Sequence, residues 1–408
     1  MHPILVRIVA QSLQQIFLEN KHADKVIEHA LRSQPKAGSR DRAFIAETTY
    51  EVLRYFRLYQ EILGKTPAQE WDFWQLAGIH FALKNTDLPP WREFEALKTP
   101  AFVEKLQHWR NMLAQDQEIP RSVRESIPEW LDQIGQQELP DSWTQTLHAL
   151  NQPASVVLRA NRLRTTPENL QKTLHAESIE CRPMANSDAL VLRVRKNVFQ
   201  SSVFKKGWFE VQDFSSQKVA PFLAPEPGMR VVDACAGGGG KTLHLAAMMQ
   251  NKGVIIAMDT HAWKLEELRK RAKRAGASNI ETRVIESKKT IKRLYNSADR
   301  LLLDVPCSGL GVLRRNPDAK WKLQPEQIDH LRQTQQDILQ SYAPITKPGG
   351  RMVYATCSIL PSENQDQIKT FLSSEVGKQF QLITDNKILP QDEGFDGFYM
   401  ALLERKKD

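Results

Sequence analysis

The sequence predicts an α/β fold, in which a doubly wound parallel sheet follows an all-helical region. From Gly228 onward, short apolar runs such as GVIIAMD and RLLLDVP alternate with helical stretches, a pattern typical of strand–helix–strand units. Near the start of the chain, Leu5, Ile8, Val9 and Leu13 recur at the spacing of one helix face. The two patterns place the helices first and the sheet last.

Three regions follow from these patterns. We expect an all-helical domain over 1–125, a connector with a small mixed α/β unit over 126–225, and the sheet domain over 226–408. In the connector, VVLRANRL and LVLRV alternate as strands do, and ENLQKTLHAESIE suits a helix.

Composition narrows the class of protein. Of the 408 residues, 41% are hydrophobic and 25% charged, as in ordinary soluble proteins. No apolar run approaches the roughly 20 residues of a membrane span, and the first residues lack a signal peptide's apolar stretch. We therefore expect a cytoplasmic protein. The net charge of +8 fits a polyanionic partner such as RNA. The four cysteines show no metal-ligand spacing, so no metal is expected.

The first sheet strand, MRVVDACA, runs into the glycine-rich turn Asp233–Thr242, DACAGGGGKT. A nucleotide-binding P-loop would need glycine where Cys235 stands, and the dinucleotide fingerprint would need glycine at Thr242 or Leu243. What remains is the looser turn of S-adenosylmethionine enzymes, whose cofactor has no pyrophosphate to hold. A tight turn without a ligand is the competing interpretation.

Several acids and one cysteine fall at predicted strand ends, where ligands bind in doubly wound sheets. Asp259 ends the strand after the glycine turn and suits the ribose hydroxyls of an adenosyl group, although a lone Asp there is also a good helix N-cap. Asp233, Asp304 and Cys357 also lie at strand ends. Their coincidence predicts a site along one edge of the sheet.

DVPCSG, with Cys307, and ATCSILPSEN, with Cys357, carry the most specific chemistry. Carbon 5 of cytosine is a poor nucleophile until a thiolate adds to carbon 6. Methyl transfer then needs an acid near the ring and a base that removes the carbon 5 proton. A cysteine is both a good nucleophile and a good leaving group, and Asp304 is placed to act at the ring.

These motifs, with DVPCSGLGVLRRNPDAKW and EGFDGFYMALLER, resemble the Sun/Nop family of RNA cytosine-5 methyltransferases, and most of all its bacterial 16S ribosomal RNA enzymes of the RsmB type. The resemblance implies a Rossmann-like methyltransferase domain, preceded by a NusB-like RNA-binding domain. It implies S-adenosylmethionine as cofactor, RNA as partner and no membrane, and we expect a monomer.

The resemblance also implies the roles of single residues. Cys357 would be the nucleophile, Cys307 would assist product release, and Asp304 would be the active-site acid; Cys307 as nucleophile remains the alternative. The turn that binds the cofactor would consist of Cys235, Ala236, Gly237, Gly238, Gly239, Gly240 and Lys241, with Lys241 also counted as catalytic. Asp259 would hold the ribose, and Glu286 would stand where the family has an Asp beside the adenine.

Two departures leave alternatives open. The family turn usually has Ala and Pro where this chain has Gly237 and Gly238, and Glu286 replaces the usual Asp. A transfer RNA substrate, or a non-catalytic assembly factor on a methyltransferase fold, therefore remains an alternative to ribosomal RNA methylation. Candidate RNA contacts are Arg159, Asn161, Arg314, Arg315, Asn316 and Asp318.

Overall fold

The computed structural model describes residues 1–115 and 119–407. They divide into two units. The helical unit contains Met1–Gln152 and Leu313–Pro325, and the sheet unit contains Pro153–Val312 and Glu326–Asp408. Helices that the sequence suggested as part of the connector thus belong to the helical unit.

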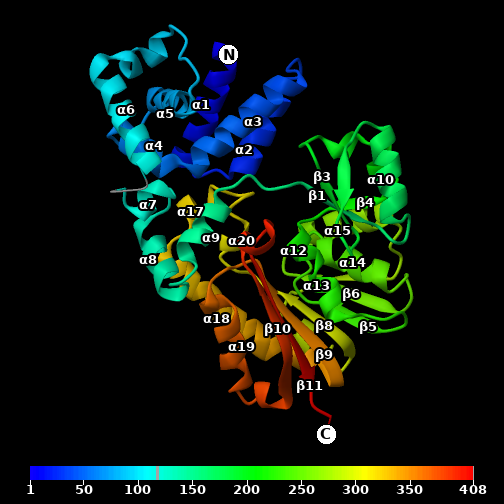
Figure 1. Cartoon of the computed structure of the whole chain (residues 1–408). Helices are drawn as coiled ribbons and strands as arrows, with labels where there is room; N and C mark the ends of the chain where they lie inside the picture. Colours follow the sequence, from blue (N-terminus) through cyan, green and yellow to red (C-terminus); the bar gives the residue numbers. More distant parts are fainter. Residues whose placement is uncertain (116–118, 408) are drawn as a thin grey trace. The chain divides into compact units, whose positions relative to one another are not determined.

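The helical unit is built around α5, which is apolar on nearly all sides. Every residue from Asp72 to Ala82 is buried, as expected of a helix surrounded by others. Helix α1 packs its face of Val6, Val9 and Leu13 into the same core. The helices of this unit are α1 (Pro3–Leu18), α2 (Ala23–Arg32), α3 (Ser39–Arg54), α4 (Phe56–Leu63), α5 (Glu70–Leu83), η1 (Arg92–Lys98), α6 (Pro100–Gln115), α7 (Arg121–Arg124), α8 (Glu129–Glu138) and α9 (Trp143–Leu150), which run from blue to blue-green in Figure 1, and α17 (Ala319–Lys322), which is yellow.

Helix α17 joins this unit although it is distant in sequence. Lys320 is 2% exposed, and its Nζ donates to the carbonyl of Arg54 at 2.8 Å. The indole Nε1 of Trp321 donates to the carbonyl of Leu53 at 2.7 Å. The chain leaves the sheet unit at Val312, so the segment after the Cys307 motif is part of the helical core.

The sheet unit begins with a four-stranded antiparallel sheet in the order β2-β3-β1-β4. The strand expected over VVLRANRL is shorter than predicted, because the chain turns at Asn161, whose side-chain oxygen accepts from the amide of Leu163 at 3.1 Å. The elements are β1 (Val157–Ala160), α10 (Pro167–Ala176), β2 (Cys181–Pro183), β3 (Ala189–Leu192), η2 (Val198–Gln200), α11 (Ser202–Lys205), β4 (Phe209–Val211), α12 (Phe214–Gln217) and α13 (Val219–Leu223).

A seven-stranded sheet follows, in the order β10-β11-β9-β8-β5-β6-β7. The five neighbouring strands β9, β8, β5, β6 and β7 are parallel, as predicted. Strands β11 and β10 are antiparallel and extend the sheet at the edge beside β9. The elements are β5 (Arg230–Asp233), α14 (Gly240–Met248), β6 (Val254–Asp259), α15 (Ala262–Ala275), β7 (Ile280–Val284), α16 (Lys288–Lys292), β8 (Ala298–Asp304), η3 (Leu310–Val312), α18 (Pro325–Tyr342), η4 (Ala343–Ile345), β9 (Thr346–Thr356), η5 (Pro361–Glu363), α19 (Gln365–Leu372), η6 (Gly377–Gln379), β10 (Phe380–Ile388), α20 (Pro390–Glu393) and β11 (Phe398–Arg405).

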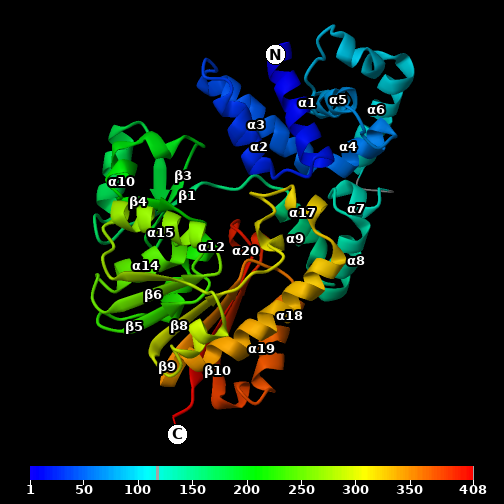
Figure 2. The ribbon, with the colours of Figure 1, turned by 180° about the vertical axis from the view of Figure 1, so that it is seen from behind.

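Helices cover both faces of this sheet, as the doubly wound prediction requires. Leu339 of α18 and Phe371 of α19 are buried against one face, and Figure 2 shows both helices running across it. Leu223 of α13 and Leu245 of α14 are buried against the other. No helix among the described residues is long and apolar enough to cross a membrane.

Candidate active site

The glycine-rich turn connects β5 to α14 at the carboxyl edge of the sheet. Gly237 and Gly239 adopt positive φ values of 52° and 84°, which favour glycine. A Cβ on Gly239 would lie 2.5 Å from Cγ of Leu268, so a side chain there would clash with α15. Gly238 is different, since its added Cβ would meet only the tip of Arg271, at 3.3 Å.

Asp259, at the end of β6, holds this turn in place. Its Oδ2 accepts a hydrogen bond from the amide of Gly237 at 3.0 Å, and its Oδ1 accepts from the amide of His261 at 2.8 Å. The carboxylate is 8% exposed. It therefore lies against the turn, where the ribose prediction needs it, and it is not the N-cap of α15, which is His261.

A pocket of about 280 Å³ opens above the turn. Asp233, Cys235, Lys241 and Asp304 line it, together with Gln212 from the chain before α12. The sequence alone gives no signal for Gln212, because it lies in a polar stretch, VQDFSSQ, between a short strand and a short helix. Of the residues at predicted strand ends, Asp233 and Asp304 thus line one pocket, whereas Asp259 and Cys357 are not part of its lining.

Asp233 is the most deeply buried acid of this pocket. Burial raises its pKa to about 7, against the hydrogen bond that Thr242 Oγ1 donates to its Oδ2 at 2.7 Å. Its Oδ1 is buried and has no hydrogen-bond partner among the described residues. A buried acceptor without a partner costs stability, so this atom suits a donor on a bound cofactor.

Lys241 and Asp304 form an ion pair across the pocket, with 2.6 Å between Nζ and Oδ2. Burial alone would lower the pKa of Lys241, but the charge and hydrogen bond of Asp304, with Cys357 nearby, outweigh it and raise the pKa. The ammonium also lies 5.1 Å from the centre of the Phe398 ring. Lys241 therefore remains charged beside Asp304 and Cys357.

The two motif cysteines are adjacent. Their sulfur atoms are 3.5 Å apart, because Cys307 follows β8 and Cys357 follows the neighbouring strand β9. The hydrogen bond with Cys357 and burial, with the charge of Glu363 nearby, raise the pKa of Cys307 well above its ordinary value. Cys307 is therefore held as a thiol.

A buried carboxylate, Glu363, connects the two cysteine loops. It accepts from Ser308, next to Cys307, through the amide at 2.8 Å and the hydroxyl at 2.5 Å. It accepts from the Ser358 hydroxyl at 2.5 Å and from Gln335 Nε2 at 3.0 Å. Glu363 is fully buried. Glu363 belongs to the motif ATCSILPSEN, but the sequence alone predicts no role for it.

Glu286 does not line the pocket above the glycine turn. It is exposed and lines a second pocket, of about 300 Å³, between α16 and α18. Tyr342 lines this second pocket too, and burial, with Cys235 and Asp259 nearby, raises its pKa to about 12. Tyr342 of the second pocket is thus within electrostatic reach of Cys235, which lines the pocket above the glycine turn.

Two predicted RNA contacts have internal partners instead. Arg159 is 3% exposed; it donates to the carbonyl of Gly240 at 2.7 Å and to Gln212. Asn161 donates to the carbonyls of Gly207 and Ala275, both at 2.8 Å. These side chains fasten the four-stranded sheet to the glycine turn and to α15, contrary to the expectation that they meet RNA.

Arg314 and Asp318 also depart from that expectation. Arg314 is 8% exposed, and its Nε donates to the carbonyl of Gln152 at 3.3 Å. Asp318 is 6% exposed and accepts from the amide of Ala23 at 3.1 Å. Both are structural parts of the helical unit. Arg315 is partly exposed and Asn316 exposed, so these two stay candidates for RNA contact.

The sheet order, the glycine turn and the acids at the strand ends define an S-adenosylmethionine-dependent methyltransferase. Residues 220–404 match the family model of 16S rRNA methyltransferase RsmB/F, and residues 127–199 match the ferredoxin-like domain of RsmF/B-like methyltransferases. The chain belongs to this RsmB/F family of RNA methyltransferases and uses S-adenosylmethionine.

Two relatives and one solved structure match nearly the whole chain, and a second solved structure matches part of it. A probable ribosomal RNA small subunit methyltransferase B of Synechocystis is 32% identical, covering 96% of this chain and 97% of that protein. Ribosomal RNA small subunit methyltransferase B of Salmonella paratyphi B is 31% identical, covering 98% of each. The crystal structure of PH0851 has a TM-score of 0.83 at 25% identity and covers 99% of each chain. NSun6 from Pyrococcus horikoshii with SFG, an S-adenosylmethionine analogue, has a TM-score of 0.64 at 19% identity, covering 70% of this chain and 100% of that chain.

Proposed function

We propose that this protein transfers a methyl group to carbon 5 of a cytosine in small-subunit ribosomal RNA, through a covalent bond between Cys357 and carbon 6. The observation that carries the proposal is the cysteine pair, 3.5 Å apart and beside the Lys241–Asp304 ion pair. Methylation at an exocyclic nitrogen or at a ribose hydroxyl would need no thiol.

The surroundings of the two thiols favour Cys357 as the nucleophile. Cys307 has a raised pKa and its sulfur lies 3.5 Å from that of Cys357, so Cys307 keeps its proton and can deliver it to Cys357. The positive charge of Lys241 acts on Cys357, whereas the carboxylate of Glu363 acts on Cys307. The neighbouring charges are therefore opposite in sign, positive near Cys357 and negative near Cys307, and this difference separates the roles of the two cysteines.

Residues of the turn fit the cofactor. The backbone of Gly237–Gly240, Asp259 at the ribose and the unpartnered Oδ1 of Asp233 would hold it, and Glu286 is the proposed contact on the adenine side. When bound, S-adenosylmethionine supplies an electrophilic methyl group. The remaining steps depend on this chain's own side chains.

The Cys357 thiolate forms a bond to carbon 6, and the electron pair of the double bond between carbons 5 and 6 becomes nucleophilic at carbon 5. Asp304 would stabilise a proton on ring nitrogen 3 of this adduct. Carbon 5 takes the methyl group and then loses its proton to a base. The double bond re-forms as the bond from sulfur to carbon 6 breaks, and the Cys307 thiol can protonate the departing Cys357.

A trapping experiment tests this proposal. The full chain is incubated with S-adenosylmethionine and small-subunit ribosomal RNA containing 5-fluorocytidine, and a denaturing gel is run. Fluorine replaces the proton that must leave, so the wild-type adduct should persist as a shifted band. Cys357→Ala should abolish the band and Cys307→Ala should retain it.

Other outcomes would change the conclusion. Loss of the band with Cys307→Ala alone would exchange the roles of the two cysteines. A band on transfer RNA but not on ribosomal RNA would contradict the substrate. If no RNA gives a band although the protein binds S-adenosylmethionine, the covalent mechanism is wrong.

A further inference from the structure

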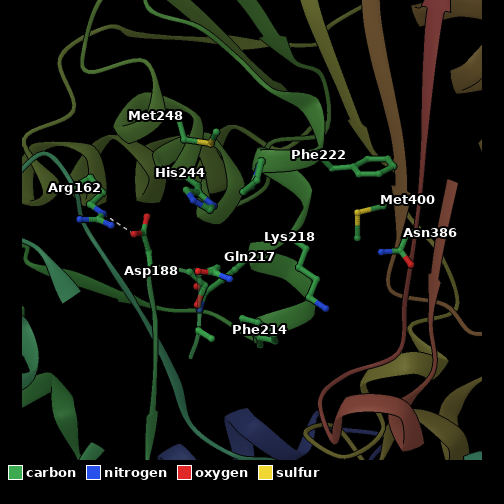
Figure 3. A pocket seen from close by; sticks show the side chains of 14 residues that line it. Arg162, Asp188, Phe214, Gln217, Lys218, Phe222, His244, Met248, Asn386 and Met400 are labelled. Atoms are coloured by element: carbon green, nitrogen blue, oxygen red, sulfur yellow. Dashed lines mark hydrogen bonds and ion pairs between the residues drawn. The ribbon is translucent and has the colours of Figure 1, made fainter. Parts of the chain in front are cut away.

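A third and larger cavity lies in the sheet unit, apart from the pocket above the glycine turn and from the pocket between α16 and α18. Its volume is about 640 Å³, within the range of about 300–1,000 Å³ typical of small-molecule pockets. It is bounded by α12, α13 and α14, the loop between β2 and β3, and strands β10 and β11. Figure 3 shows its lining side chains. The proposed methyl transfer uses none of them.

The lining combines aromatic faces with amide groups. Phe214 and Phe222 line it from α12 and α13, and Gln217 and Asn386 add amides from α12 and β10. RNA-binding proteins hold unstacked bases in this way, with aromatic side chains against the base face and polar groups at its edge. The mixture suits a nucleobase better than a purely apolar ligand.

Two buried polar atoms of the lining, one on each of two side chains, lack hydrogen-bond partners among the described residues. His244 and Gln217 are each 4% exposed. His244 Nδ1 and Gln217 Oε1 have no hydrogen-bond partner among the described residues, and the ring of His244 projects from α14 on the side of Gln217 (Figure 3). Burial, with Arg159 nearby, lowers the pKa of His244 well below its ordinary value, so the ring is neutral. A neutral imidazole offers one donor and one acceptor, as a base edge does.

The cations at the rim are already paired. Arg162 Nε lies 2.5 Å from Asp188 Oδ1, and Lys218 Nζ lies 2.6 Å from the carboxylate of Glu393. Lys218 also lies 4.9 Å from the centre of the Phe214 ring. A bare phosphate would have to displace these carboxylates. The groups without partners are the amide and imidazole atoms inside, so the cavity favours a base over an inorganic anion.

The cavity is adjacent to the proposed catalytic site. Lys241, His244 and Met248 share one face of α14, so the cavity begins about one helical turn, roughly 5 Å, from Lys241. On β11, Phe398 beneath Lys241 and Met400 of the cavity point to the same side. Helix α12 separates the two pockets. An RNA strand that places its target cytosine at Cys357 therefore passes near this cavity.

We propose that this cavity receives one unstacked nucleotide of the RNA substrate, close to but distinct from the target cytosine. The proposal rests on the proposed function, since it assumes that RNA lies across the adjacent site. An aromatic side chain of a protein and a free nucleoside are the other occupants that the test must separate.

The test is a scan with abasic sites. In the shortest small-subunit ribosomal RNA fragment that the full chain binds, bases are removed one at a time, and the dissociation constant is measured by fluorescence anisotropy. Base–aromatic stacking predicts that one non-target position weakens wild-type binding about tenfold. Phe222→Ala should weaken binding of the intact RNA by a similar factor. When that same base is removed from the RNA, the dissociation constant of the Phe222→Ala protein should change less than twofold.

Two further variants make the test decisive. Asn386 is exposed on β10 and tolerates truncation, so Asn386→Ala supplies the same comparison if Phe222→Ala does not fold. Phe199→Ala, at a ring 55% exposed outside the cavity, is the matched control and should retain the full abasic effect. If no non-target base couples to Phe222 or Asn386, the proposal is overturned. Binding of free adenosine or of an aromatic peptide without such coupling overturns it as well.

Because the readout is binding, failure of the proposed methyl transfer is distinguishable from failure of this proposal. A protein that forms no adduct with 5-fluorocytidine can still show, or fail to show, coupling between one base and Phe222.

Discussion

Two neighbouring glycines of the cofactor turn should respond oppositely to the same substitution. Gly239 has a φ of 84°, and its added Cβ would lie 2.5 Å from Leu268 Cγ. A left-handed conformation costs an alanine about 1–2 kcal/mol and overpacking costs about 1–3 kcal/mol. Gly239→Ala should therefore destabilise the turn by about 2–5 kcal/mol.

Gly238 is free of both problems. Its φ lies outside the left-handed range, and the added Cβ would meet only Nη1 of Arg271, at 3.3 Å. That guanidinium donates to the carbonyl of Gly238 at 2.7 Å and pairs with Glu210, so it must shift by a few tenths of an ångström while keeping these partners. Gly238→Ala should stabilise the turn by about 0.4–1 kcal/mol, because alanine reduces the entropy of the unfolded chain.

Amide hydrogen exchange over α14, followed by mass spectrometry, measures this difference locally and avoids assuming that two units unfold together. Exchange should accelerate by about 30-fold or more in Gly239→Ala, since each 1.4 kcal/mol is about a factor of ten. It should slow or stay unchanged in Gly238→Ala. Affinity for S-adenosylmethionine should fall only in the first variant. Equal acceleration in both would refute the distinction between the two glycines.

Three further substitutions test other parts of the structure. Glu363→Gln places an amide group against hydroxyl donors, so kcat for methylation should fall at least tenfold while affinity for S-adenosylmethionine stays within twofold. Asp233 has a raised pKa of about 7, so its folded form favours the proton; the stability of the cofactor-free protein should fall as pH rises from about 4 to about 7, and Asp233→Asn should flatten that fall. Lys320→Ala leaves the carbonyl of Arg54 without its buried donor and should destabilise the helical unit by about 2–4 kcal/mol, seen as faster proteolysis within 313–325.

Matched variants control for general effects of these changes. Glu375 has a side chain 90% exposed, so Glu375→Gln should leave kcat unchanged. Lys98 is exposed in the helical unit, and Lys98→Ala should leave proteolysis unchanged. Wild-type kcat in Glu363→Gln would show that the cysteine loops do not depend on this carboxylate. An unaltered pH profile in Asp233→Asn would assign the titration to another group.

The parallel part of the sheet could be predicted because buried strands leave continuous apolar runs, such as that of β6. The antiparallel edge could not. Seven consecutive residues of β10, Gln381–Lys387, are exposed, and apart from Leu382 and Ile383 they are polar, so the strand lacks the continuous apolar run that revealed the others. Strand β11 is apolar, but its direction depends on pairing with β9 and β10, and no local pattern records that pairing.

The predicted site residues share a property that makes them visible in a sequence. Asp259, Asp304 and Cys357 each end an apolar strand, so local pattern and sheet geometry together predict that they meet. Glu363 lies in a polar loop, where an acid is unremarkable. Its importance comes from the serines that follow each cysteine, and only the folded chain shows that both hydroxyls donate to one carboxylate.

The basic residues show the opposite failure. The family resemblance makes Arg159 a candidate for RNA contact, and Arg314 is a candidate because it follows the strand that carries the Cys307 motif. In the structure both donate to backbone carbonyls, those of Gly240 and Gln152. Nearly every residue has a carbonyl, so a sequence cannot show which one accepts from a given arginine. Net charge therefore predicts the class of partner, whereas the identity of the contacting cations depends on which of them the fold leaves at the surface.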